Sequence, residues 1–214
     1  MIKPEEILKD IINKLNIIDD SDIPAIDLYM DQVTTFMDSQ LSGSKRHNDD
    51  KILTKTMINN YSKNDLLPPP VKKRYSKQHV ILLIFIYYYK NILSINDINT
   101  ILSPICENYF DKNKICSLDR IYNEACDIET NMINDVTADI QHKIDASKER
   151  FTDLPEDDRD FLQLYSLITS LCFDVYLKKQ MLEGIIDHMN PEDDFTPSKE
   201  AKKSKDTDNK TRKN

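Results

Sequence analysis

Apolar residues recur every three or four positions through most of the chain, the spacing that places them on one face of a helix. Near the start, this pattern predicts a helix over residues 4–15 and a second helix over residues 25–41, with an acidic loop at 19–22 between them. Residues 42–50 are polar and include Gly43, so they indicate a mobile linker rather than a further helix.

Three shorter helices are predicted in the middle of the chain, over residues 54–64, 76–92 and 94–102. The residues that are able to cap their first turns are Thr54, Ser76 and Ser94. Three consecutive prolines at 68–70 separate the first helix from the second, and Pro104 is expected to end the third, because proline has no amide hydrogen to continue a helix.

The central helix contains an apolar run at residues 80–89. A membrane span needs about 20 apolar residues, so this shorter run predicts a helix buried inside the protein. His79 lies beside the run and is expected to be a surface or hydrogen-bonded residue rather than a metal ligand. The tyrosines at 87–89 are expected in the core or at its edge, and a small-molecule pocket beneath them stays an open alternative.

Two long helices are predicted in the second half, over residues 118–146 and 155–187. The apolar stripe of the first is narrow, as in a helix that packs on a partner helix. It consists of Leu118, Ile121, Tyr122, Ala125, Ile128, Met132, Val136, Ile140 and Ile144. The apolar face of the second is much broader, and residues 191–214 are polar and charged, which predicts a disordered tail.

The composition suits a soluble, helical protein of the cytoplasm. Hydrophobic residues make up 39% and charged residues 31% of the 214 residues, and there are only two glycines, too few for an all-β fold or a Gly-rich phosphate loop. The start of the chain has no signal-peptide pattern, and no membrane span is expected. None of the four cysteines forms a Cys-x-x-Cys pair, so reduced thiols are expected.

The charge of the chain is unevenly distributed. The net charge is −8, yet residues 45–79 hold nine basic residues against three acidic ones, a local excess of +6. Residues 1–44 hold three basic residues against nine acidic ones, which gives −6. A basic island in an acidic protein is a candidate surface for phosphate groups, and the acidic remainder would confine nucleic-acid binding to that one face.

A family resemblance enters at the basic island. Residues 53–61 have the sequence Leu-Thr-Lys-Thr-Met-Ile-Asn-Asn-Tyr, and residues 65–76 have the sequence Asp-Leu-Leu-Pro-Pro-Pro-Val-Lys-Lys-Arg-Tyr-Ser. With Ser94-Ile-Asn-Asp-Ile further on, this order resembles the MerR family of DNA-binding proteins. Members of that family have a recognition helix ending in tyrosine, a Gly-Leu-Leu segment with proline, and a basic wing closed by Arg-Tyr-Ser.

The chain as a whole, and residues 26–33 and 54–75 in particular, also resembles a family of uncharacterised proteins from low-GC Gram-positive bacteria, described only as a domain of unknown function. Two features depart from the MerR pattern. The wing, residues 68–75, is short, and the first helix of the helix-turn-helix is not adjacent, so the helix at 25–41 would have to supply it across the polar linker.

The resemblance implies an all-α fold with a MerR-like winged helix-turn-helix module over residues 50–103. N-terminal helices at 1–44 precede it, and a long helical hairpin at 117–188 follows it. It also implies a homodimer, joined through the stripe at 118–144, that binds double-stranded DNA. The residues expected to contact DNA are Lys55, Thr56, Asn59, Asn60, Lys63, Lys72, Lys73, Arg74 and Tyr75.

The chemistry of these residues suits DNA. Asparagine can pair with an adenine edge, and lysine and arginine can reach guanine or phosphate. The hydroxyl of Tyr75 and the backbone amides at the Ser76 helix start are further candidates for phosphate contact. Each has a plainer alternative: Asn59 and Asn60 as solvated helix residues, the basic run at 72–74 as an ordinary charged turn, and Tyr75 as a packing residue.

No catalytic constellation is recognisable in the sequence, since the histidines at 47, 79, 142 and 188 are scattered and no nucleophile stands beside a base. We therefore expect neither an enzyme nor a bound metal or cofactor, and the sequence identifies no small-molecule effector. The alternative function is a protein-interaction adaptor, in which a degenerate helix-turn-helix serves as a docking surface and the acidic hairpin binds a partner protein.

Overall fold

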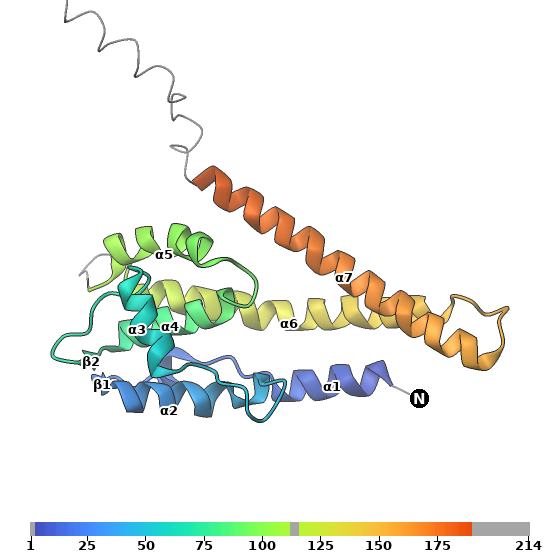
Figure 1. Ribbon diagram of the computed structural model, residues 1–214, viewed down its shortest axis with the longest axis horizontal. Coiled ribbons are helices and arrows are strands. Elements are labelled where there is room, and N and C mark those ends of the chain that lie inside the picture. The colour runs from blue at the N-terminus through green and yellow to red at the C-terminus, as the bar shows by residue number, and fades with distance from the viewer. Residues whose placement is uncertain (1–2, 112–115, 190–214) are drawn as a thin grey trace, which may run out of the picture.

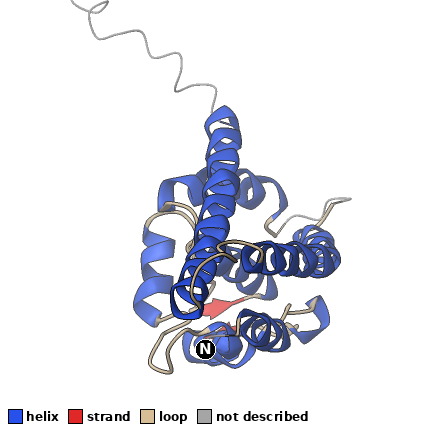
Figure 2. Ribbon diagram, turned by 90° about the vertical axis from the view of Figure 1, so that its right-hand side faces the viewer, coloured by secondary structure: helices blue, strands red, loops and turns tan. Residues whose placement is uncertain are grey.

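The structure is a computed structural model that describes residues 3–111 and 116–189. Over these residues the chain forms seven α-helices, two short 3-10 turns and one two-stranded ribbon (Figures 1 and 2). In chain order they are α1 (Pro4–Lys14), η1 (Asp20–Asp22), β1 (Leu28–Tyr29), α2 (Met30–Leu41), η2 (Ser42–Ser44), α3 (Lys55–Lys63), β2 (Arg74–Tyr75), α4 (Lys77–Tyr89), α5 (Ile95–Tyr109), α6 (Leu118–Lys148) and α7 (Glu156–Met189). The fold is therefore mostly helical, as predicted, and the tail expected at 191–214 lies outside the described residues.

Most of the buried side chains form one body, which we call the head. It comprises residues 18–111 and 116–122, from the loop before η1 to the first turns of α6. Its core contains 25 buried apolar residues. Helix α4 lies at its centre, with every residue from His79 to Tyr87 buried, so the predicted buried helix is confirmed. Tyr122 of α6 donates a buried hydrogen bond to the carbonyl oxygen of Ile18 at 2.5 Å, which ties the start of α6 to the start of the head.

The remaining helices form a second body, which we call the stem: α1, α6 beyond Tyr122, the loop 149–155, and α7. Figure 1 shows α6 extending away from the head, with α1 along one side and α7 returning obliquely along the other. A separate and much smaller cluster joins them, with Leu8, Ile144 and Leu167 as its buried residues. The N-terminal segment 1–44, predicted as one unit, therefore contributes to both bodies. Helix α1 packs in the stem, and helix α2 packs in the head.

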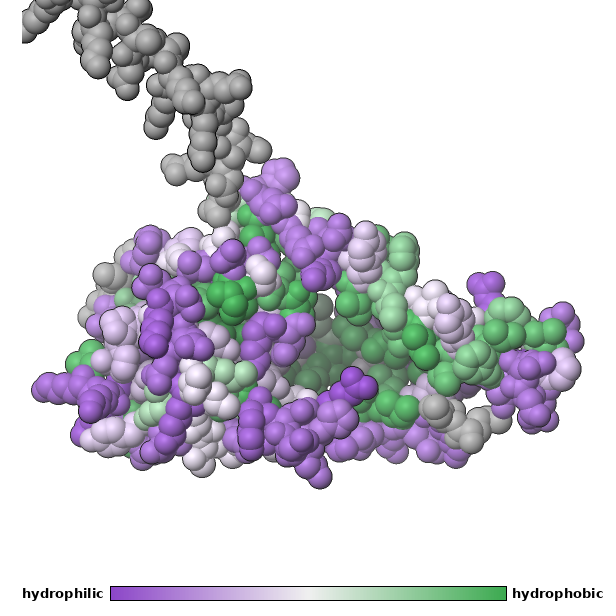
Figure 3. Space-filling model, in the orientation of Figure 1, coloured by the Kyte–Doolittle hydropathy of each residue, from purple (hydrophilic) through white to green (hydrophobic). Residues whose placement is uncertain are grey.

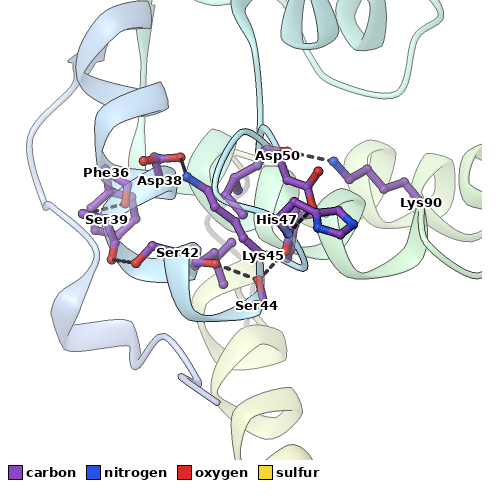
Figure 4. Close-up of polar contacts among 12 residues, drawn as sticks. Phe36, Asp38, Ser39, Ser42, Ser44, Lys45, His47, Asp50 and Lys90 are labelled. Carbon is purple, nitrogen blue, oxygen red and sulfur yellow. Dashed lines mark hydrogen bonds and ion pairs between the residues drawn. The ribbon is translucent and has the colours of Figure 1, made fainter. Parts of the chain in front are cut away.

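The segment between α2 and α3 is docked on the head, although its polar sequence indicated a mobile linker. Ser44 hydrogen-bonds the hydroxyl of Tyr87, and Lys45 forms an ion pair of 2.6 Å with Asp38 (Figure 4). Lys90, which follows the last residue of α4, donates to the carbonyl oxygen of Ile52 at 2.8 Å. These side-chain contacts hold the segment against α2 and α4, so α3 begins from a fixed position.

Two helix boundaries differ from the prediction. Helix α2 begins at Met30 rather than near residue 25, because Leu28 and Tyr29 pair as a strand with Tyr75 and Arg74. The side-chain oxygen of Gln32 accepts the Tyr29 amide hydrogen at 2.8 Å and caps the helix there.

Helix α5 continues through Pro104 to Tyr109, whereas the sequence predicted an end at the proline. Its expected capping box is present, since the Asp97 amide donates to Ser94 Oγ at 3.2 Å. Beyond the proline, the side chain of Asn108 donates to the Pro104 carbonyl oxygen at 2.9 Å. Ile105, Cys106 and Tyr109, which follow the proline, pack partly buried against the core of the head, so packing outweighs the cost of the proline, about 3 kcal/mol.

Among the described residues, no helix combines the length and the apolar composition needed to cross a membrane.

Candidate nucleic-acid interface

Helix α3 presents one polar face to solvent. Thr54 caps the helix, its Oγ1 accepting the amide hydrogen of Met57 at 3.2 Å. Ile58 and Tyr61 are buried in the head, which orients the opposite face outward. All five residues predicted on that face are exposed, and they are Lys55, Thr56, Asn59, Asn60 and Lys63. Among the described residues of α3 there is no acidic side chain, so this face carries a lysine at each end, Lys55 and Lys63, and neutral polar side chains between them.

The end of α3 turns the chain sharply toward the wing. Asp65 adopts a left-handed backbone with φ of +58°, and the Leu66 amide donates to the Tyr61 carbonyl oxygen at 2.9 Å. This is the Schellman arrangement, which usually has glycine at the left-handed position. Leu66 and Leu67 then enter the core, which fixes where the wing leaves the head.

The tip of the wing is a two-residue hairpin turn made of Lys72 and Lys73. The Arg74 amide donates to the Val71 carbonyl oxygen at 2.9 Å, and both lysines have positive φ, +51° and +64°. Two successive positive φ angles characterise a type I′ turn, which favours Asn-Gly. A left-handed backbone costs a residue with a side chain about 1–2 kcal/mol. The chain therefore carries two exposed cations at a position where they are conformationally unfavourable.

Arg74 is held beside this tip by Tyr29 of β1. The two residues are partners in the β1–β2 ribbon. The guanidinium donates to the Tyr29 hydroxyl oxygen at 3.2 Å, and its carbon lies 5.1 Å from the centre of the ring. Tyr29 is 51% exposed, so this pair is on the surface. Sequence reasoning missed Tyr29, because 45 residues separate it from Arg74 and only the strand pairing brings them together.

Tyr75 does not belong to the exposed set. It is 3% exposed and its ring packs edge-on against the ring of His79, with 5.6 Å between the centroids. The packing alternative considered for this residue therefore applies, and its expected phosphate contact is not available on the surface. The backbone amide of Ser76, at the start of α4, is not free to bind a phosphate either. It donates its hydrogen to His79 Nδ1 at 3.0 Å.

His79 supports the base of the wing from inside the head. Its ring also meets Phe110 edge-on, at 4.8 Å between centroids. Since Nδ1 accepts the Ser76 amide hydrogen, the neutral ring carries its proton on Nε2, which is buried without a hydrogen-bond partner among the described residues. Burial lowers the pKa of His79, and the nearby carbonyl groups of Pro69 and Pro68 oppose that shift without reaching hydrogen-bond geometry with Nε2.

The positive surface is smaller than the basic island of the sequence. Lys45 pairs with Asp38, and Lys77 pairs with Asp20 at 2.7 Å and with Asp119. Lys55 forms an ion pair with Asp31 at the start of α2. Within residues 3–111 and 116–189, no carboxylate pairs with the remaining basic residues of the island, which are Arg46, Lys51, Lys63, Lys72, Lys73 and Arg74.

Helix α3, the ribbon and the wing tip all lie at the end of the molecule opposite the α6–α7 loop (Figure 1). The space-filling view shows hydrophilic side chains projecting from that end, with smaller apolar patches between them (Figure 3). The exposed α3 face, the wing tip and the Arg74–Tyr29 pair together make the candidate interface. In the part of the chain that the structure describes, no group of three or more His, Cys, Asp or Glu side chains could hold a metal ion.

Comparison with known families identifies the head. The chain belongs to the family described as a domain of unknown function, DUF1836, which it matches over residues 18–125. The match covers the whole head and the first turns of α6, and it leaves α1, most of α6 and α7 outside. The predicted relationship to a family of unknown function is thereby confirmed. Comparisons with curated proteins and with solved structures give no match.

Proposed function

We propose that this protein is a sequence-specific DNA-binding transcriptional regulator of the MerR type. In this proposal α2 and α3 form the helix-turn-helix, α3 enters the major groove, and residues 66–75 form the wing. The observation that carries it is the cationic tip at Lys72 and Lys73. An otherwise acidic protein exposes two adjacent lysines in a strained turn, beside a helix face that has no acidic side chain.

Each exposed residue has a role in this arrangement. Asn59 and Asn60 are exposed where they can pair with adenine edges, while Lys63 and the wing lysines reach phosphates or guanine. Unfavourable backbone conformations tend to persist where function requires them. The net charge of −8 makes the rest of the surface repel DNA, so binding is confined to the face that carries α3 and the wing.

Lys55 forms an ion pair with Asp31, which must break before Lys55 can contact DNA. Both side chains are more than half exposed, so the pair is weak and a phosphate can displace the carboxylate. We also propose that two copies act together, since a two-fold pair of α3 helices would contact two half-sites on one side of the duplex.

The experiment is to measure binding of the purified protein to fragments of its own genome at two salt concentrations. The test variant carries Lys72→Glu, Lys73→Glu and Arg74→Glu. The matched control carries Lys3→Glu, Lys9→Glu and Lys14→Glu, which changes the net charge by the same amount on α1. We expect sequence-selective, salt-sensitive binding that the wing variant loses and the control retains.

Failure of the folded wild-type protein to bind any fragment would overturn the proposal. An equal loss in both triple variants would show that only the net charge matters, and it would remove the wing from the interface. In the first case the protein-interaction adaptor becomes the better hypothesis, and its binding through apolar surface would depend little on salt.

A further inference from the structure

Helix α7 is exposed on nearly all sides, although it carries many large apolar side chains. Eleven large apolar side chains of α7 are exposed, and only Leu167 and Ile186 are buried. Phe161, Val175 and Met181 are 67%, 63% and 66% exposed. The other eight are Tyr165, Ile168, Phe173, Tyr176, Leu177, Leu182, Ile185 and Met189. A helix that is hydrophobic on several faces is normally covered by other helices.

The exposed area is large enough to specify an interface. Eleven half-exposed apolar side chains present on the order of 1,000 Å² of surface. The largest apolar patch of a typical monomer is about 300–600 Å², whereas each side of a standard stable interface buries about 800 Å². Summed over all its faces, the exposed apolar area of α7 is therefore comparable with what one side of a stable dimer buries.

The sequence of α7 also has the spacing of a helix that pairs with another helix. From Phe161 to Met189, steps of four and three residues alternate without a break. The positions are Phe161, Tyr165, Ile168, Cys172, Val175, Lys179, Leu182, Ile186 and Met189, and Lys179 is their one charged residue. Ile186 is already buried within the chain, so the seam available to a partner is formed by the other positions. This 3.5-residue repeat is typical of a coiled-coil seam.

The same chain offers a concave apolar surface to receive such a helix. A hollow lies between the head and α7, over the middle of α6, and its walls are hydrophobic (Figure 3). On α6, Ile128, Met132 and Val136 are exposed, with Ile128 at 59%. A groove of about 640 Å³ between α5 and α6 runs beside Ile128, and its walls include Ile101 and Ile121.

We propose that a second copy of this chain covers these surfaces, each copy placing the seam of its α7 in the hollow of the other. A reciprocal arrangement of this kind is a closed two-fold dimer, in which the same two patches meet twice. It covers both the convex apolar helix and the concave apolar floor. Pairing of α7 with α7 alone would leave Ile128, Met132 and Val136 in water.

The dimer of the proposed function would form through these surfaces, but their pairing does not depend on DNA binding. It also differs from the stripe at 118–144 that the MerR resemblance indicated, because most of the exposed apolar area is on α7. The family match ends at residue 125, so the proposed interface is built almost entirely from the part of the chain outside the matched segment.

The test is the mass of the full chain in solution without DNA, measured by light scattering at micromolar concentration. We expect about twice the monomer mass of 25.0 kDa. Ile168→Glu, on the seam, should weaken self-association at least about a hundredfold, because symmetry buries the added charge twice. Thr169→Glu adds the same charge at the next exposed position, off the seam, and should leave the mass unchanged.

A second pair of variants tests the receiving surface. Ile128→Glu should dissociate the dimer, whereas Thr130→Glu, on an exposed polar position of α6, should not. Circular dichroism verifies that each variant retains its helices. A wild-type mass of 25.0 kDa at all concentrations would overturn the inference. A dimer that persists in the Ile168→Glu variant would also overturn it. The same holds if Ile168→Glu dissociates the dimer and Ile128→Glu leaves it intact. None of these outcomes would decide whether the head binds DNA.

Discussion

The head and the stem differ in how they use their apolar residues. Among the described residues, the head buries 25 apolar side chains in one cluster and leaves five large ones exposed at scattered positions, Ile26, Tyr29, Val71, Ile92 and Ile95. The stem has three buried residues in its own cluster and seventeen large exposed ones. Both regions are helical with similar spacing, so the same local pattern produces a closed core in one region and an open surface in the other.

The contrast shows where the stability of the protein resides. In the head, α4 is surrounded by α2, α3, α5 and the start of α6, so each side chain meets neighbours on several sides. In the stem, α6 and α7 meet along part of their length, near the loop that joins them (Figure 1). Segments with few buried contacts open locally at low free energy, so we expect the stem to open before the head in the isolated chain.

The largest predicted effect is a truncation in the head. Leu83, at 0% exposure in the middle of α4, is surrounded by the core. Leu83→Ala should lower the free energy of unfolding by about 3 kcal/mol or more, because the change leaves a cavity that the packed neighbours cannot fill. Urea denaturation followed by circular dichroism measures this, and the loss should not depend on protein concentration.

The matched truncation in the stem is Leu167→Ala, which removes the same atoms from the small cluster. It should accelerate hydrogen exchange in α7 and leave the protection of the α4 amides unchanged. If α4 loses protection to the same extent, the head and stem unfold as one cooperative unit and the contrast drawn between them is wrong.

A smaller effect is predicted at the wing tip, where one substitution should raise the stability of the fold and lower the affinity for DNA. Replacing Lys72 and Lys73 with Asn-Gly should stabilise the fold by about 1 kcal/mol in all, because these residues suit the left-handed turn. The same change should weaken DNA binding about tenfold or more at moderate salt, because two phosphate contacts disappear. Thermal unfolding and DNA titration measure the two effects.

The control for this prediction carries Lys72→Gln and Lys73→Gln, which removes the charges and retains side chains in the turn. It should lose binding to the same extent without gaining stability. Full binding by the Asn-Gly variant would show that the strained lysines are not part of the interface.

The smallest predicted effect is a pH dependence in the head. Burial lowers the pKa of His79 in the folded state, whereas the pKa of the unfolded side chain is about 6.5. Above that pH the histidine is neutral in both states. As the pH falls below it, the unfolded state takes up a proton that the folded state resists, so stability decreases until the folded pKa is reached.

His79→Gln separates this contribution from those of other groups. Glutamine can accept the Ser76 amide hydrogen, as Gln32 does for Tyr29, but it does not titrate in this range. Thermal unfolding between pH 8 and pH 5 should therefore show a weaker decline in the variant than in the wild type. Parallel curves would mean that protonation of His79 is not coupled to folding.

The sequence was informative where the determining interactions are local. The spacing around Ile58 and Tyr61 and the capping residue Thr54 placed α3 within one residue of its observed ends. The stripe that begins at Leu118 predicted α6 correctly over nearly its whole length. The charge excess also indicated the region of the candidate interface, because charge can be counted without a structure.

Contacts distant in the sequence were not predictable in the same way. The pairing of Leu28 and Tyr29 with β2 shortens α2, and core packing carries α5 through Pro104. The hydrogen bond of Ser44 with Tyr87 orders the segment expected to be a linker. In each case a partner tens of residues away outweighs the local preference of the chain.

By itself, the sequence determined which segments are helical, which faces of them are apolar and where positive charge is concentrated, because these depend on neighbours one turn away. Only the tertiary structure decided which of the lysines remain unpaired, that Tyr75 faces the core while Tyr29 supports Arg74, and that α4 is covered while α7 is exposed. The physical reason is that burial and ion pairing depend on which distant surfaces meet, and spacing along a single helix does not specify its partner.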